Sequence, residues 1–156
     1  MIRKMLVTSA LCLLAAFPAC ARTHEVTWAQ NKATTKLSLN DEEFDLLCHT
    51  VFCEAGNQDS ETQRLIAVTI LNRVLHEGFP NTLHEVIYQD KGKQFNVVRW
   101  KGFPDAYEYT NTTVDACTKA LSCSEEPLEL LFFRNKHYHK GYRNYVKSGD
   151  VFFSLG

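Results

Sequence analysis

The sequence predicts a helix-rich α+β domain with a small β-lobe late in the chain. Apolar residues recur at helical spacing in several segments between residues 40 and 121. The later apolar runs at residues 130–133 and 151–153 are too short for helices and are typical of strands. Helices packed beside a small sheet are one of the few stable layer arrangements of a domain.

The first 21 residues have the features of an export signal. Arg3 and Lys4 precede an apolar run, and Ala19-Cys20-Ala21 offers small residues for cleavage after Ala21. A lipoprotein acylated at Cys20 and an uncleaved membrane anchor are the alternatives. We expect an exported protein of the periplasm, the cell envelope or the extracellular space, with residues 1–21 as a signal peptide.

The mature chain is predicted to contain a flexible lead-in at residues 22–37 and a single domain at residues 38–156, long enough to bury a core. Residues 1–21 hold two of the 17 basic residues and none of the 18 acidic ones, so the mature chain is slightly acidic. A nucleic-acid-binding protein usually has a basic excess, and we therefore expect no nucleic-acid partner.

Helix signals define the first half of the domain. Asn40 is predicted to cap a helix with Glu43 at its third position, and this helix should end near Gly56, which can adopt the left-handed cap conformation. A second helix, from about Ser60 to His76, is apolar nearly all round and should be buried.

The second half is predicted to begin with a short helix at residues 82–88. A loop-like segment at residues 89–105 follows, with a short hairpin around residues 95–98, and then a helix at residues 110–121. The predicted strands at residues 130–133 and 151–153 close the domain.

Four cysteines remain after the signal: Cys48, Cys53, Cys117 and Cys123. An even number in an exported chain indicates disulfides. Cys48 and Cys53 point in different directions on one predicted helix, so they should not pair with each other. Either both pair with Cys117 and Cys123, or a local Cys117–Cys123 bridge forms alone.

Three kinds of site could explain the stretch Cys48–Gln58. The set Cys48, His49, Cys53, His137 and His139 lacks the close ligand pairs of zinc motifs, so we expect no metal and no other cofactor. A Cys53–His49 nucleophile pair shares one helix face, but an oxidising compartment disfavours a free catalytic thiol. A carboxylic acid, Glu54, stands between an apolar helix and a glycine turn, where partial burial would keep it protonated for general-acid catalysis.

The chain resembles the cell wall hydrolase family that includes the spore-cortex-lytic enzymes SleB and CwlJ. The resemblance covers residues 41–153, and its motifs are residues 54–58 (Glu-Ala-Gly-Asn-Gln), 66–74, 79–82, 86–89, 94–95, 131–135 and 149–153. It implies a lysozyme-like fold, a peptidoglycan glycosidase activity and a catalytic acid at Glu54. Gln58 stands where many members have a second Glu, Asn96 replaces the usual Ser, and Val151 stands in place of a histidine of the closing motif.

A single motif carboxylate suits a lytic transglycosylase, in which Glu54 is first the acid and then the base. The bond cleaved would lie between N-acetylmuramic acid and N-acetylglucosamine. A muramidase using water and Asp90 or Asp105, or a non-catalytic peptidoglycan-binding protein, are the alternatives. The biological role could be spore germination, wall remodelling or phage lysis.

We expect the partner to be the glycan strands of peptidoglycan and the protein to be a monomer. Such an enzyme should need regulation, although the sequence shows no regulatory segment, and the regulatory protein partner is unknown. The substrate-binding candidates are Tyr88, Gln89, Gln94, Phe95, Asn135 and Tyr138. For Tyr88 and Phe95, packing in the core is an equally good interpretation.

Overall fold

The computed structural model of the chain describes residues 24–30, 33–122 and 126–156. The signal at residues 1–21 and Cys123 lie outside these ranges. The elements are β1 (His24–Gln30), β2 (Ala33–Leu39), α1 (Asp41–Ala55), α2 (Ser60–Leu75), α3 (Leu83–Tyr88), η1 (Gln89–Lys91), η2 (Asn96–Arg99), α4 (Asn111–Ser122), β3 (Leu130–Asn135), β4 (Arg143–Ser148) and β5 (Val151–Leu155). No helix in these described ranges has the length and apolar character to cross a bilayer.

Helix α1 begins as predicted. The Asn40 side chain accepts a hydrogen bond from the backbone N–H of Glu43 at 2.9 Å, and the Glu43 carboxylate accepts one from the backbone N–H of Asn40 at 3.0 Å. The helix also ends near Gly56 as predicted, but one detail was wrong. The backbone of Gly56 has the right-handed helical conformation, with φ −62°, and not the left-handed one. Glycine is needed there for space, since a Cβ atom would lie 2.7 Å from the Phe52 ring.

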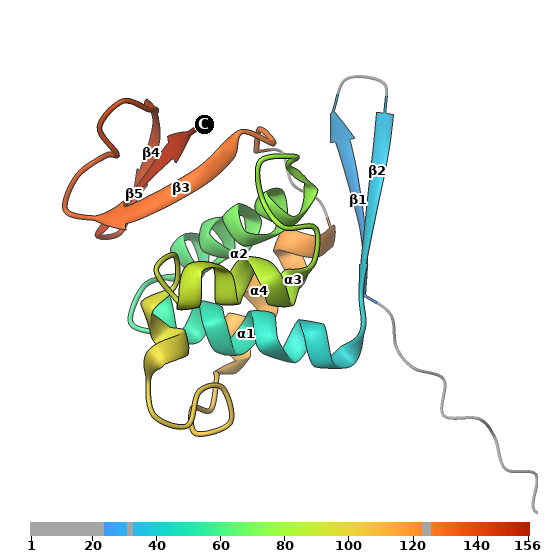
Figure 1. Ribbon diagram of the computed structural model, residues 1–156, viewed down its shortest axis with the longest axis vertical. Helices are drawn as coiled ribbons and strands as arrows, with labels where there is room; N and C mark the ends of the chain where they lie inside the picture. The colour runs from blue at the N-terminus through green and yellow to red at the C-terminus, as the bar shows by residue number, and fades with distance from the viewer. Residues whose placement is uncertain (1–23, 31–32, 123–125) are drawn as a thin grey trace, which may run out of the picture.

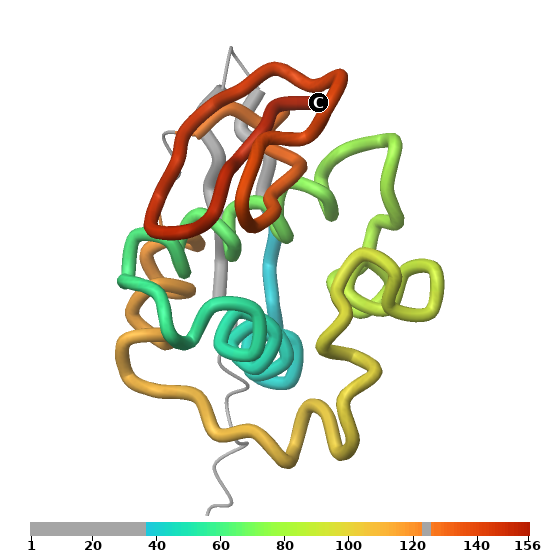
Figure 2. Tube along the Cα trace, turned by 90° about the vertical axis from the view of Figure 1, so that its left-hand side faces the viewer, coloured from blue at the N-terminus to red at the C-terminus, as the bar shows by residue number. Residues whose placement is uncertain are grey.

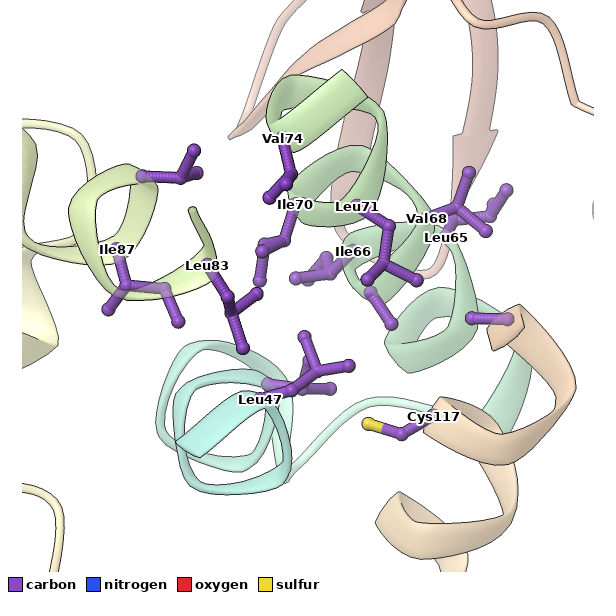
Figure 3. Packing of buried hydrophobic residues seen from close by; sticks show 14 of the residues in the cluster. Leu47, Leu65, Ile66, Val68, Ile70, Leu71, Val74, Leu83, Ile87 and Cys117 are labelled. Atoms are coloured by element: carbon purple, nitrogen blue, oxygen red, sulfur yellow. The ribbon is translucent and has the colours of Figure 1, made fainter. Parts of the chain in front are cut away.

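Helix α2 is the centre of the domain. Asp59 caps it by accepting a hydrogen bond from the Thr62 N–H at 2.7 Å, and most of its residues from Thr62 to Val74 are buried. Figure 3 shows Leu47 of α1 and Leu83 of α3 pointing toward the same interior as Leu71 of α2. Burial on several sides of α2 explains why its sequence lacks a polar face.

The segment between α3 and α4 contains the short 3₁₀ helices η1 and η2 rather than the predicted hairpin around residues 95–98, so that prediction was wrong. Phe95 and Val97 are both buried, which gave the sequence the alternation of a strand. The two residues instead anchor a turn, in which the Val98 and Trp100 N–H groups bond back to the Phe95 and Val97 carbonyl oxygens.

Strands β3, β5 and β4 form an antiparallel sheet in that order, and β3 packs against α2 (Figure 1). The predicted strands at residues 130–133 and 151–153 are present as β3 and β5. Strand β4 was not predicted. It lies at the edge of the sheet, is mostly exposed, and contains polar residues without apolar alternation.

Within the segment predicted to be a flexible lead-in, residues 22–37, the structure describes strand β1 and most of strand β2, which form an antiparallel hairpin. The segment contains several residues with high strand propensity, among them Val26, Thr27, Trp28, Thr34 and Thr35. Leu39 at the end of β2 is buried in the core, and β1 contacts α4.

Candidate active site

A cavity of about 480 Å³ lies between the C-terminal end of α1 and the sheet. Glu54, Asn57 and Gln58 line it from α1 and the following turn, and Asn135, Lys136, Lys147, Asp150, Val151 and Phe152 line it from the sheet and its loops. Figure 2 views α1 nearly along its axis from this end, with β3–β5 above it in orange and red. A concave site that collects polar groups from separate segments is a typical ligand site.

Glu54 is half-buried at the edge of this cavity. Burial raises the pKa of its carboxyl group to about 7, although a hydrogen bond from the Val97 backbone N–H and the charge of Arg73 act in the opposite direction. Near neutral pH the group is therefore divided between its protonated and ionised forms. This is the property that a general acid needs when the same group must later act as a base.

Arg73 is a buried cation close to Glu54. Its side chain is 4 % exposed, and its Nε donates a 2.7 Å hydrogen bond to the Leu131 carbonyl oxygen. The guanidinium carbon lies 5.2 Å from the ring centroids of Phe79 and Phe95 and 5.7 Å from that of Phe132. Burial lowers the pKa of Arg73 to about 10, against the opposing effect of Glu54, so the side chain stays charged at neutral pH.

Gln58 joins the end of α1 to the turn between β4 and β5. Its Oε1 accepts a hydrogen bond from the Asp150 backbone N–H at 3.1 Å, and Thr62 and Ser148 share a 2.7 Å hydroxyl contact beside it. Gly149 in this turn has φ +52°, and a Cβ atom there would lie 2.3 Å from Gln58 Oε1. The structure thus assigns Gln58 a structural hydrogen bond at the position where related chains were expected to carry a second Glu.

The predicted substrate-binding residues fall into different places. Asn135 lines the cavity with Glu54, and Tyr138 packs edge-on against Phe152 with 5.0 Å between ring centroids. Phe95 is fully buried against Phe133 and Arg73, as in the core interpretation.

The other three candidates do not line this cavity. Tyr88 is half-buried and stacks on His84, with 4.4 Å between ring centroids. Gln89 lines a separate cavity of about 690 Å³ next to the loop after α2, and its Oε1 is buried without a hydrogen-bond partner among the described residues. Gln94 is exposed.

Asp150 was not among the predicted site residues, and from the sequence Arg73 could be either a structural residue of the buried second helix or a substrate contact. Asp150 is the second carboxylate of the cavity, whereas the sequence offered Asp90 and Asp105 for that role. Asp105 instead lies near Tyr88, where burial and, to a smaller extent, the charge of Asp105 raise the pKa of the Tyr88 hydroxyl. The signal for Asp150 was its place in the closing motif, and the signal for Arg73 was a charge within an otherwise apolar helix.

The described residues contain no group of three or more His, Cys, Asp or Glu side chains that could hold a metal ion. Burial raises the pKa of Cys53 to about 11, with a further contribution from Glu54, and this disfavours the nucleophilic thiolate. His49 contacts Asp45 through Nε2 at 3.3 Å. The cysteine–histidine pair therefore lacks the arrangement of an activated nucleophile.

Cys48, Cys53 and Cys117 are free thiols in the structure. Cys117 lies on α4 within hydrogen-bonding reach of Cys48, and this contact together with burial raises the pKa of Cys117. Helices α1 and α4 thus bring two of the predicted disulfide partners into contact.

The comparisons with known proteins agree with this architecture. A family model for the Cell Wall Hydrolase family matches residues 57–153, a region that begins just after Glu54. No curated protein matches the chain.

Two solved structures have similar folds. One is the catalytic domain of the Bacillus cereus SleB protein, with a TM-score of 0.60 and 23 % identity over 72 % of this chain and 88 % of that one. The other is the catalytic domain of the germination-specific lytic transglycosylase SleB from Bacillus anthracis, with a TM-score of 0.60 and 20 % identity over 81 % of this chain and 99 % of that one. These likenesses confirm the predicted helix-rich α+β fold with its late sheet.

Proposed function

The chain belongs to the cell wall hydrolase family, and on that premise we propose that it cleaves peptidoglycan glycan strands as a lytic transglycosylase with Glu54 as its single acid and base. The observation that carries this proposal is the state of Glu54. Its carboxyl group lines the cavity and has a pKa raised to about 7 by burial. One group with that pKa can give a proton and later take one back at neutral pH.

The reaction would proceed in two proton transfers. Glu54 donates its proton to the glycosidic oxygen as the bond from C1 of N-acetylmuramic acid to that oxygen breaks. The Glu54 carboxylate then removes the proton from the C6 hydroxyl of the same sugar while O6 bonds to C1. The products are a 1,6-anhydromuramic end and a free N-acetylglucosamine hydroxyl, and no water is consumed.

The surroundings of Glu54 support its change of charge. When the proton leaves, the Val97 backbone N–H and the cation of Arg73 stabilise the carboxylate, as the lowering of its pKa by both groups indicates. Arg73 is held by the Leu131 carbonyl oxygen and three phenylalanine rings, so little reorganisation is needed during the reaction. Phe152 and Asn135 line the opposite wall of the cavity, where we expect them to contact the sugars.

Hydrolysis of the same bond is the second candidate, and Asp150 is the observation that favours it. Asp150 lines the cavity with Glu54 and is exposed, so it could activate a water molecule in a two-carboxylate mechanism. A non-catalytic peptidoglycan-binding protein would have no need for the buried carboxyl group of Glu54, whose desolvation is unfavourable.

We also propose that the mature chain acts outside the cytoplasm as a monomer. Its family acts on the cell wall, and its first residues fit an export signal. In an oxidising compartment the contact between Cys48 and Cys117 would allow a disulfide between α1 and α4. The intact mass of the exported protein before and after reduction tests the bridge, and its amino-terminal sequence tests cleavage after Ala21.

The enzymatic proposal is tested by digesting purified peptidoglycan sacculi and identifying the products by mass. The chain lacking residues 1–21 should release anhydromuramic ends, Glu54→Gln should release none, and Glu108→Gln, an exposed control, should act like the wild type. Asp150→Asn separates the candidates, because it should keep the anhydro product if Glu54 acts alone. Muramic reducing ends that disappear in Asp150→Asn would establish hydrolysis instead.

A further inference from the structure

The sheet and its loops carry a concentration of positive charge that the proposed reaction does not use. Residues 130–149 contain five basic residues and no Asp or Glu, although the whole chain has a net charge of −1. We call this set the cationic surface; all of its members are exposed, and they are Arg134, Lys136, Lys140, Arg143 and Lys147.

The strand register places part of the cationic surface directly at the candidate active site. Phe152 of β5 pairs with Arg134 of β3 on one side and with Lys147 of β4 on the other. Directly paired residues of an antiparallel sheet project from the same face, so Arg134, Phe152 and Lys147 share one face of the sheet. The Lys147 Nζ atom is 5.3 Å from the centroid of the Phe152 ring. Phe152 and Lys147 line the cavity that contains Glu54.

The surface continues beyond the cavity along the loop before β4. Lys136 lines the cavity, whereas Lys140 and Arg143 do not. The intervening loop is held to the sheet, because the His139 backbone N–H donates to Ser154 Oγ at 3.3 Å. The cationic surface therefore includes residues that line the cavity with Glu54 and residues of the β-lobe outside it.

This charge is not neutralised within the described part of the protein. None of the five cations forms an ion pair there. Glu61 and Glu126 lie near Tyr145 of β4, but both bind Arg64, at 2.7 and 2.6 Å. Apart from Glu54, Asp150 is the one acid that lines the cavity. Unpaired charges of one sign around a cleft attract a substrate of the opposite sign.

We propose that the cationic surface binds the carboxylate groups of the peptides attached to the glycan strand, so that the protein prefers peptidoglycan whose stem peptides are negatively charged. This inference rests on the proposed function, since it concerns the substrate of the same site. The peptides are attached to the muramic acid residues, so they lie beside the bond that Glu54 would protonate. The exposed cations are long and flexible enough to follow such mobile carboxylates.

The test compares two forms of the same sacculi, prepared from walls that lack phosphate polymers. One form is untreated, and in the other the peptide carboxylates are converted to neutral amides. Binding is measured by sedimentation with Glu54→Gln, and cleavage is measured separately with the wild-type chain. Glu54→Gln should bind the untreated sacculi roughly tenfold more tightly than the amidated ones, and added salt should reduce this difference.

Charge reversal locates the effect on the molecule. Adding Lys140→Glu and Arg143→Glu to Glu54→Gln should remove most of the roughly tenfold preference. Lys119→Glu, an exposed change on α4, should leave the preference as it was. Equal binding to both forms of sacculi would overturn the inference, as would an equal loss in the Lys119→Glu control. A preference that appears only with walls retaining phosphate polymers would also overturn it.

Cleavage and binding separate the two proposals. Wild-type cleavage without a binding preference would retain the proposed function and reject this inference. A binding preference that depends on Lys140 and Arg143, without cleavage by the wild type, would support the cationic surface and reject the enzymatic proposal.

Discussion

The side-chain oxygen of Gln58 accepts a 3.1 Å hydrogen bond from the backbone N–H of Asp150. This contact joins residues that are far apart in the sequence and holds the β4–β5 turn against the end of α1. Because Glu54 lies four residues before Gln58 and both line the cavity, the same contact fixes the two walls of the cavity relative to each other. Gln58, which the resemblance places where a second Glu was expected, thus supplies an acceptor for the turn without adding a charge beside Asp150.

The Gln58–Asp150 contact predicts an unusual sensitivity at Gly149. Gly149→Ala places a Cβ atom 2.3 Å from Gln58 Oε1 and also strains a residue with φ +52°. We expect a loss of about 2 kcal/mol in the free energy of unfolding, measured by urea denaturation, and a lower kcat. Gly141→Ala is the matched control, since Gly141 has φ +90° and open space around it. Equal losses in both variants would show that the contact with Gln58 contributes nothing.

The pKa of Glu54 predicts the pH dependence of the wild-type reaction. The protonated form is the active acid, and burial raises the pKa of Glu54 to about 7. The value of kcat/KM should therefore be constant at low pH and fall about tenfold per pH unit above this pKa. A profile measured on soluble glycan fragments checks this expectation. A kcat/KM that rises with pH through neutrality would mean that Glu54 begins the reaction as a base.

Arg73 should control the pH at which kcat/KM begins to fall. Arg73→Met removes a cation that lowers the pKa of Glu54, so the decline in kcat/KM should move to higher pH. The variant also leaves the Leu131 carbonyl oxygen without its partner, at a cost of about 1–3 kcal/mol in stability. Arg64→Met, on the same helix, breaks the ion pairs with Glu61 and Glu126 and serves as the control. If the decline in kcat/KM moved as far in Arg64→Met as in Arg73→Met, the effect of Arg73 on the pKa of Glu54 would be contradicted.

Glu54 should also reduce stability as the pH rises. Its pKa is raised in the folded protein from 4.5 to about 7, so the stabilising effect of protonation is fully present below pH 4.5 and is lost as the pH rises through 7. Glu54→Gln has no such loss. Its unfolding free energy relative to wild type should therefore increase by about 1–3 kcal/mol between pH 5 and pH 8. Thermal unfolding at both values checks this, and a difference that does not change with pH would contradict the buried carboxyl group.

Local patterns in the sequence predicted the helical part of the fold well. The capping box of Asn40 and Glu43 defined the start of α1, and the continuous apolar pattern of α2 identified the central helix. Local signals failed where burial and propensity disagree. Strand β4 is exposed and polar, and Phe95 and Val97 are buried in a turn, so one strand was missed and one hairpin was wrongly predicted.

The candidate site could be predicted only where a single motif carries it. Glu54 was identified from its position and its resemblance to a family motif, and the structure places it in a cavity with a raised pKa. Asp150 and Arg73 approach the site through tertiary contacts between distant segments, which no local pattern encodes. Phe95 illustrates the converse, because an aromatic residue in a motif can serve the core rather than the ligand.

The most direct test of the central claim is a digestion of peptidoglycan by the wild-type chain in water labelled with heavy oxygen. A transglycosylase that closes O6 onto C1 consumes no water, so mass spectrometry should find anhydromuramic ends without label. Hydrolysis would instead place heavy oxygen on C1 of muramic acid, and products with that label would contradict the account of Glu54 as a single acid and base.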